Sequence, residues 1–220
     1  MSSRFTRRTG GVSHGAFASL NLGTHVGDNL EDVQKNRQIV AAKVGPTQYM
    51  NQVHGDRIAV IEEVTDETPT ADALVTGIPG ISLAVMVADC IPLLLTARES
   101  VAAVHVGRRG LTNEITRKTI ALMRDMGASQ ISAIIGPAIC GKCYEVSEDV
   151  YQEVITSHPF AESRTSQGTF ALDLPAALRS VLSDEGIAIV NQFECTVENQ
   201  ELFSYRRDGV TGRQAGIISL

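Results

Sequence analysis

Three apolar segments in the middle of the chain give the strongest structural signal. Residues 81–88 are almost wholly apolar, and residues 93–96 and 101–106 follow at short spacing. Strands that are buried on both faces show such continuous apolar runs, because neither face meets water. The pattern therefore predicts a sheet that is covered on both sides. Similar but shorter signals predict further strands at residues 57–62, 131–135 and 187–190.

Helical periodicity is mixed with these strands. Asn29 is a favourable capping residue, and the valines that follow it recur on one helical face. Arg37 shares that face, which is an unusual place for a solvated charge. Further helices are expected at residues 112–126, 147–156 and 174–185, and polar loops at residues 62–72 and 162–168. Strands and helices do not alternate strictly, which favours an α+β layered fold in one domain over residues 1–220.

The composition is that of a globular protein. The chain has 220 residues, of which 43% are apolar and 20% are charged, so a core can form and disorder is excluded as the main state. No apolar run reaches the roughly 18 residues that span a bilayer. The net charge of −6 opposes non-specific binding to nucleic acid, which is also negatively charged. The N-terminus lacks an apolar stretch after its positive charges, so we expect a cytoplasmic protein with neither membrane nor nucleic acid as partner.

The chain contains four cysteines, which we expect to be reduced in that compartment. Cys140 and Cys143 form a CxxC motif, which suggests a redox pair or half of a zinc site. A structural zinc ion would need two more ligands, and the sequence has none at close spacing. We therefore interpret the motif as a Gly-Pro loop whose cysteines have no required chemistry.

Ligand-type residues stand at the ends of apolar strands in three segments. They are His54 in NQVHG, Cys90 in VADC and His105 in VHVGRRG. Two imidazoles and one thiolate form a legitimate three-ligand zinc site with a fourth position for water or substrate, and copper accepts the same ligands. Asp89 emerges from an apolar strand, so its carboxylate needs a partner if it is buried.

Arginines next to these segments suggest anion binding. Arg109 follows His105 closely, and Arg206 follows an aromatic residue in FSYRR. Arginine recognises phosphate with two parallel hydrogen bonds, although a solvated surface position is an equally simple interpretation. His14, His25 and His158 receive no role from the sequence.

Several motifs, taken in order, resemble one known family. They are GVSHGAFASLNLGTHVGDN, the pair Asn36-Arg37, NQVHG, ADCIPLLL, AAVHVGRRG, IGPAICGKCYEV, the pair Cys195-Thr196, and FSYRR. The chain is similar to the YfiH-type family, which has been called laccase-domain or polyphenol oxidoreductase and, more recently, purine nucleoside phosphorylase. The similarity runs from about residue 10 to residue 216.

The resemblance implies a single-domain α-β-β-α sandwich and a metal ion, usually Zn²⁺ and alternatively Cu²⁺, held by His54, Cys90 and His105. It implies phosphorolysis of adenosine, inosine, guanosine and methylthioadenosine, and deamination of adenosine. A role in editing peptidoglycan precursors is attached to some members. The sequence departs from the family pattern HxGWRG at Arg108, which stands where a tryptophan is usual.

We assign roles on this basis as hypotheses. Asp89 carries a proton in deamination. The nucleoside is oriented by Asn21 and Gln52. The phosphate is bound by Arg37, Arg109 and Arg206. The partners are then a purine nucleoside and phosphate, and the chain is a monomer or homodimer.

Three alternatives stay open. A copper polyphenol oxidase would want a weak axial ligand, for which Met86 is near in sequence. A cysteine hydrolase would use Cys90 as nucleophile, His105 as base and Asp89 as the residue that orients the base. The third alternative is a metal-binding or interaction protein without enzymatic activity.

Overall fold

The apolar segments form strands of two different sheets in the computed structural model, which describes residues 1–220. The smaller sheet has the strand order β1 (Ser2–Phe5), β12 (Gln214–Ser219), β5 (Ser82–Val87), β2 (Thr47–Gln48). The larger sheet has the order β11 (Ala188–Asn191), β8 (Ser132–Ile135), β6 (Ile91–Thr96), β7 (Val101–Val106), β4 (Ala73–Thr76), β3 (Ile58–Val60). Consecutive strands β5 and β6 therefore belong to different sheets.

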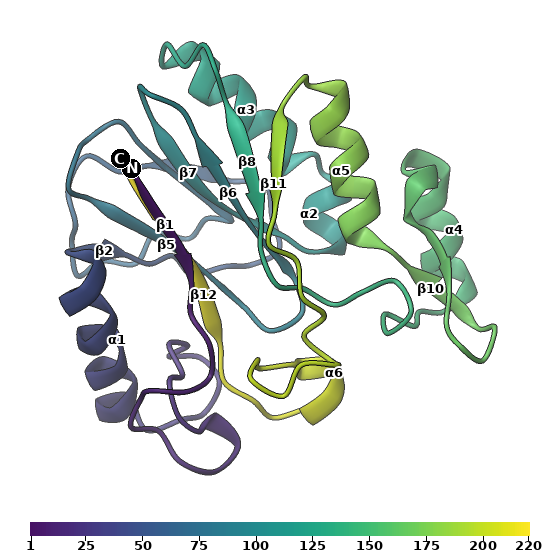
Figure 1. The fold of residues 1–220 in the computed structure, drawn as a ribbon, viewed down its shortest axis with the longest axis horizontal. Helices are drawn as coiled ribbons and strands as arrows, with labels where there is room; N and C mark the ends of the chain where they lie inside the picture. Colours follow the sequence, from purple (N-terminus) through teal and green to yellow (C-terminus); the bar gives the residue numbers. More distant parts are fainter.

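Helices cover the two outer faces of this pair of sheets (Figure 1). The smaller sheet is covered by α1 (Leu30–Val44). The larger sheet is covered by α2 (Arg108–Thr112), α3 (Ile115–Asp125) and α5 (Leu174–Asp184). The remaining elements lie beside these layers: α4 (Glu148–Ser157), the hairpin β9 (Glu162–Arg164) with β10 (Phe170–Leu172), α6 (Tyr205–Asp208) and the 3-10 turns Gly15–Phe17 and Pro159–Ala161. The layer order is α-β-β-α, which confirms the expected fold class.

The continuous apolar run of β5 is explained by burial on both faces. Leu83 and Val85 point into the core between the two sheets, whereas Ala84 and Met86 point toward α1. Successive side chains of a strand alternate between faces, so each face receives its own apolar set. Strand β6 repeats the arrangement: Leu94 packs between the sheets and its neighbours pack against the outer helices.

Helix α1 begins where the sequence predicts. The side chain of Asn29 accepts hydrogen bonds from the backbone N–H groups of Glu31 at 2.8 Å and Asp32 at 3.4 Å. Arg37 lies on the buried face because its guanidinium stacks on Tyr49, 3.9 Å from the ring centroid, and its Nε donates to the Leu22 carbonyl at 3.0 Å. The charge is thus packed and hydrogen-bonded, not solvated.

Three expectations need correction. The helix predicted over residues 112–126 begins three residues later, at Ile115, because Glu114 adopts the left-handed conformation with φ of 62° directly before it, and the short helix α2 that precedes it was not predicted. The loop predicted at residues 162–168 begins as strand β9. The chain ends were not predicted as strands, yet β1 and β12 pair antiparallel, with β1 at the edge of the smaller sheet and β12 inside it. No helix combines the length and the apolar character that crossing a bilayer requires.

Leu94→Ala tests the packing between the sheets. Leu94 is fully buried there, so its truncation should lower the free energy of unfolding by about 2–5 kcal/mol. The matched control is Ile78→Ala, at a residue that is 44% exposed, where a change within about 0.5 kcal/mol is expected. Urea unfolding followed by circular dichroism measures both. Equal effects in the two variants would contradict tight packing between the sheets.

Candidate active site

Three ligand-type side chains meet at one edge of the two sheets. Cys90 lies in the turn where the chain crosses from β5 to β6, and His105 is the last residue but one of β7. His105 is paired with Pro92 of β6, so the antiparallel strands bring it back beside Cys90. His54 arrives from the loop between β2 and β3. The ligand atoms of the three residues all lie within 4.8 Å of one another.

The backbone at this edge is strained in two places. His54 has φ of 58° and Asp89 has φ of 102°, both in the left-handed region that non-glycine residues seldom adopt. Close approach also constrains Gly107, where an added Cβ would lie 3.0 Å from Cys90 Sγ and 3.2 Å from His54 Cδ2. Strain of this kind persists where the surroundings enforce it, and it gathers at functional sites.

The buried carboxylate of Asp72 holds two of the three ligand residues. Its oxygens accept hydrogen bonds from three consecutive backbone N–H groups, those of Val53 at 3.2 Å, His54 at 2.9 Å and Gly55 at 2.7 Å. His105 Nδ1 donates to Asp72 Oδ1 at 2.8 Å. With Nδ1 thus occupied, His105 keeps Nε2 for a ligand or a metal ion, an arrangement common around metal-binding histidines.

Cys90 and His105 form a coupled pair. Burial raises the pKa of Cys90, but the charge of His105 and hydrogen bonds from His105 and His54 outweigh it and lower the pKa to about 6. Burial lowers the pKa of His105, and the Cys90 and Asp72 charges reverse that shift and raise it to about 9. The pKa of Asp72 is raised by burial, yet its hydrogen bonds bring it below the ordinary value. The imidazoles therefore favour the thiolate form of Cys90, which is the form that binds metal ions.

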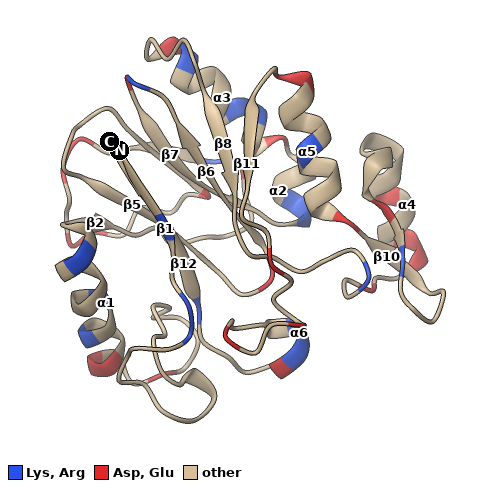
Figure 2. Ribbon diagram, in the orientation of Figure 1, with Lys and Arg blue, Asp and Glu red and all other residues tan.

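The three residues line a cavity of about 580 Å³. Its wall mixes apolar and aromatic side chains with cations. The lining residues are His25, Gln52, His54, Met86, Val87, Ala88, Asp89, Cys90, His105, Ile139, Tyr144, Tyr205, Arg206 and Arg213. Arg206 of α6 and Arg213, directly before β12, bring two cations to this lining in a chain whose net charge is −6. Basic positions on α6 and near the start of β12 are blue in Figure 2. The cavity is large enough for a small organic ligand.

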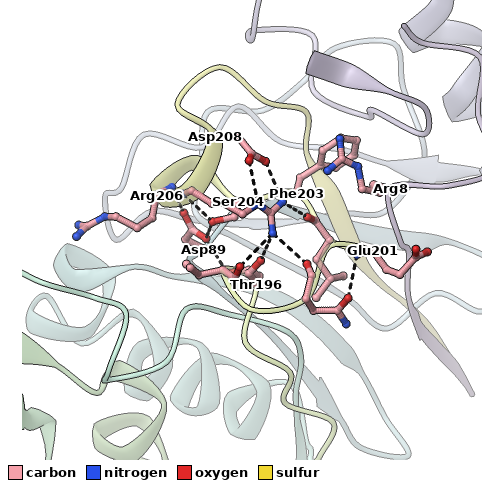
Figure 3. Close-up of polar contacts among 12 residues, drawn as sticks. Arg8, Asp89, Thr196, Glu201, Phe203, Ser204, Arg206 and Asp208 are labelled. Carbon is pink, nitrogen blue, oxygen red and sulfur yellow. Dashed lines mark hydrogen bonds and ion pairs between the residues drawn. The ribbon is translucent and has the colours of Figure 1, made fainter. Parts of the chain in front are cut away.

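Asp89 faces the cavity and anchors the C-terminal segment that closes it. Its Oδ1 accepts hydrogen bonds from Thr196 Oγ1 at 2.6 Å and Ser204 Oγ at 2.7 Å, and its Oδ2 accepts one from the Arg206 backbone N–H at 2.7 Å (Figure 3). The partner that the sequence required for this carboxylate is therefore a set of three neutral donors. They fix the start of α6 against the turn that carries Cys90.

Arg207 completes this anchor from inside the same segment. Its guanidinium donates to the carbonyls of Thr196 at 2.8 Å and Leu202 at 2.8 Å, and it pairs with Asp208 at 2.8 Å. Because Arg207 is engaged in these contacts, Arg206 is the arginine of this helix that faces the cavity. Arg206 lies 5.3 Å from the Tyr144 ring centroid and donates to the Glu145 carbonyl at 2.8 Å.

The structure gathers some of the residues expected at the site and not others. Besides the three ligands and Asp89, Gln52 and Arg206 line the cavity. Both ends of the Gln52 amide are bonded to the Met86 backbone, at 2.8 and 2.9 Å. Asn21, Arg37 and Arg109 do not line the cavity. Asn21 is buried and accepts a hydrogen bond from the Arg213 backbone, Arg37 lies behind Met86, and Arg109 is exposed on α2.

Four residues at or beside the site were not found from the sequence. Tyr144 and Arg213 line the cavity, as does His25, which had no role. The pKa of His25 is lowered, first by burial and then by the charges of Arg213 and Arg37. Asp72 lies behind His105. The only sequence signal for Asp72 was an acidic residue placed directly before an apolar strand.

The side chain of Arg108, where the resemblance led us to expect a tryptophan, lies outside the cavity lining. Arg108 starts α2 and pairs with Glu153 of α4, with Nη1 and Oε2 3.1 Å apart. The substitution therefore places a cation beside the cavity wall rather than among the cavity-lining residues.

The chain can now be compared with known proteins. The family model described as "multi-copper polyphenol oxidoreductase laccase" matches residues 2–220. The chain belongs to this family. Among curated proteins, it is 43% identical to a purine nucleoside phosphorylase of Corynebacterium glutamicum, over 98% of this chain and 93% of that protein. It is 36% identical to the purine nucleoside phosphorylase YfiH of Shigella flexneri, over 97% of this chain and 91% of that protein.

Solved structures show the same fold. A Neisseria meningitidis protein superposes with a TM-score of 0.90 at 43% identity, covering 98% of this chain and 92% of that chain. YlmD of Geobacillus stearothermophilus superposes with a TM-score of 0.89 at 34% identity, covering 99% of this chain and 90% of that chain. The family resemblance inferred from the motifs is thereby confirmed.

The lowered pKa of Cys90 predicts how its thiol titrates in protein stripped of metal. The thiolate absorbance near 240 nm should rise with a midpoint near pH 6, because the His105 charge favours the ionised form. In His105→Gln that charge is gone and only His54 opposes the effect of burial, so the midpoint should move upward, toward or above the ordinary cysteine value of about 8.5. Subtracting the titration of Cys90→Ala isolates the signal. An unchanged midpoint in His105→Gln would contradict the pairing.

Proposed function

We propose that this protein is a metal-dependent purine nucleoside phosphorylase, acting on adenosine, inosine, guanosine and methylthioadenosine. The observation that carries the proposal is one cavity that joins a His-Cys-His ligand cluster to two arginines and two tyrosines. The activity named for the curated relatives supports the same assignment.

The donor set of the cluster fits a divalent metal ion. His54, Cys90 and His105 supply two imidazole nitrogens and one thiolate, which suit Zn²⁺ and, alternatively, Cu²⁺. When bound there, such an ion would act as a Lewis acid toward the substrate. Asp72 supports this role because it fixes the His105 ring through Nδ1.

Phosphate binding falls to the arginines that line the cavity. Arg206 and Arg213 donate to backbone carbonyls, at 2.8 and 3.0 Å, and neither guanidinium forms a salt bridge with a carboxylate, although the charges of Cys90 and Asp89 act on Arg213. A cation without an acidic partner at a cavity wall favours an anionic ligand. We therefore propose Arg206 and Arg213 for phosphate, in place of the Arg37 and Arg109 that the motifs had suggested.

The purine base would be held by the apolar and aromatic part of the wall. Tyr144 and Tyr205 offer ring surface, and Met86 and Ile139 add apolar contact. Gln52, whose amide is held by the Met86 backbone, retains one N–H and part of its oxygen for the base. Asn21 would act indirectly. Its side-chain oxygen accepts a hydrogen bond of 2.8 Å from the Arg213 backbone N–H and so positions that arginine.

Phosphorolysis then proceeds by displacement at the sugar. A phosphate oxygen forms a bond to the anomeric carbon as the bond to the base breaks, and the base leaves with the bonding pair and takes up a proton. The arginines stabilise the phosphate charge throughout.

We propose adenosine deamination as a second activity of the same cavity. Water replaces the 6-amino group, giving inosine and ammonia, and a group at the site must carry a proton to the departing nitrogen. Asp89 is the carboxylate among the lining residues, which makes it the candidate. Its three hydrogen bonds also give it a positioning role, so its replacement should disturb both activities.

Polyphenol oxidation is the second candidate function. The description of the family model and the presence of Met86 at the cavity, a potential weak copper ligand, favour it. The hydrolase alternative changes in one respect: Asp72, not Asp89, is the carboxylate that orients His105.

One assay separates these functions. Protein of measured metal content is incubated with adenosine, with and without phosphate, and the products are separated by chromatography. Phosphate-dependent adenine is expected from the phosphorylase, and inosine without phosphate from the deaminase. Both should fall to background in Cys90→Ala, because the ligand cluster is lost. Full phosphorolysis in a metal-free Cys90→Ala variant would overturn the shared site, and phenol oxidation without adenine formation would favour the oxidase.

The phosphate site is tested by replacing one arginine at a time. Arg206→Met should raise the KM for phosphate by roughly 10-fold or more, because hydrogen bonds to charged groups contribute about 1.5–3 kcal/mol. The KM for the nucleoside should change less. Arg109→Met serves as the comparison, since Arg109 is exposed on α2 outside the cavity lining. If Arg109→Met has the larger effect on phosphate, the placement at Arg206 is wrong.

A further inference from the structure

A second group of ligand-type side chains lies outside the cavity described above. It consists of the thiols of Cys140, Cys143 and Cys195 and the carboxylate of Glu198, whose ligand atoms all lie within 4.8 Å of one another. The sequence predicted that the CxxC motif had no further ligands near it. That prediction was wrong, because Cys195 and Glu198 come from a distant part of the chain.

The backbone brings these four residues together by specific contacts. Ala138 and Cys195 form a parallel bridge, in which the Thr196 N–H donates to the Ala138 carbonyl at 3.1 Å. The N–H groups of Cys143 and Tyr144 both donate to the Cys140 carbonyl at 3.0 Å, which folds the CxxC motif into a tight turn. The two segments are thus held side by side independently of the cysteine side chains.

The spacing of the ligand atoms suits a tetrahedral zinc ion. A zinc–sulfur bond of about 2.3 Å and a zinc–oxygen bond of about 2.1 Å at the tetrahedral angle place the sulfur and the oxygen about 3.6 Å apart. Glu198 Oε1 lies 3.7 Å from Cys143 Sγ and 4.0 Å from Cys140 Sγ, equal to or slightly longer than such an edge. All four cysteines of the chain are free, so none of these thiols is committed to a disulfide.

We propose that Cys140, Cys143, Cys195 and Glu198 bind a zinc ion in a structural site distinct from the His54-Cys90-His105 cluster. Three thiolates favour a soft ion, and the carboxylate favours Zn²⁺ over Cu⁺. Four protein ligands leave no open position for substrate, which is the pattern of structural rather than catalytic zinc.

The ion would tie together two segments that build the cavity wall. Ile139 and Tyr144, on either side of the CxxC turn, line the cavity. Thr196, next to Cys195, donates to Asp89 at 2.6 Å. Arg206 reaches across to the Glu145 carbonyl at 2.8 Å. Loss of the ion should therefore loosen the wall without removing a residue that contacts substrate.

The test counts zinc in the full-length chain. Purified protein dialysed against buffer without chelator should hold about two zinc ions per chain, and Cys90→Ala and Cys195→Ser should each hold about one. The double variant should hold none. Glu198→Gln is compared with Glu201→Gln, an exposed glutamate on the same segment whose side chain is not among the clustered ligands. Glu198→Gln should lower the zinc affinity, and Glu201→Gln should leave it unchanged.

Cobalt gives a second readout that does not depend on activity. In Cys90→Ala the catalytic cluster has no thiolate, so any thiolate-to-cobalt charge-transfer band must come from the three remaining cysteines. The band should be present in Cys90→Ala and in Cys90→Ala/Glu201→Gln, and lost in Cys90→Ala/Cys195→Ser. If Cys195→Ser fails to fold, Cys143→Ser at a more exposed ligand replaces it. Cys90→Ala protein that holds neither zinc nor the cobalt band would overturn the proposal, as would a disulfide among the three cysteines.

Discussion

The geometry of the ligand cluster depends on a single buried carboxylate. Asp72 has no exposed surface, so its charge must be met by donors within the protein. The loop of residues 53–55 supplies three N–H groups, and it can do so only by curling around the carboxylate, which places His54 in the left-handed region. His105 supplies the fourth donor and loses the freedom of its ring. Asp72, the residue directly before β4, thus determines where two of the three ligands point.

The opposite wall of the cavity depends on a second carboxylate at a strand end. Asp89 gathers Thr196, Ser204 and the start of α6, and Arg207 ties the carbonyls of the same segment together. Both carboxylates stand where a strand meets a loop, so the rigid sheet edge sets the position of each loop. The ligand cluster and the arginines are then held at fixed positions relative to one another, although they come from widely separated parts of the chain.

How much could be predicted from the sequence depends on how far apart along the chain the interacting residues lie. Cys90 and His105 were found because buried strands at short spacing form a hairpin, and α1 was found because Asn29 caps it locally. The role of Asp72 depends on contacts with residues 53–55 and 105, which no periodicity encodes. Cys195 joins the CxxC turn, and β1 joins β12, only through pairing between distant segments. Arg37 was correctly noticed as unusual, but its partner Tyr49 could not be read from helical spacing.

The charges around the cavity explain how one family can carry two kinds of name. Two imidazoles and a thiolate suit copper as well as zinc, so the ligand cluster by itself is compatible with oxidation or with nucleoside chemistry. The difference lies in the remainder of the wall. A phenol would gain little from two guanidinium groups without salt-bridge partners, whereas the phosphate that we propose as substrate could pair with both. In a chain of net charge −6, cations retained at one cavity favour an anionic substrate there and not a general attraction to anions. The arginines therefore decide between the two names more than the metal ligands do.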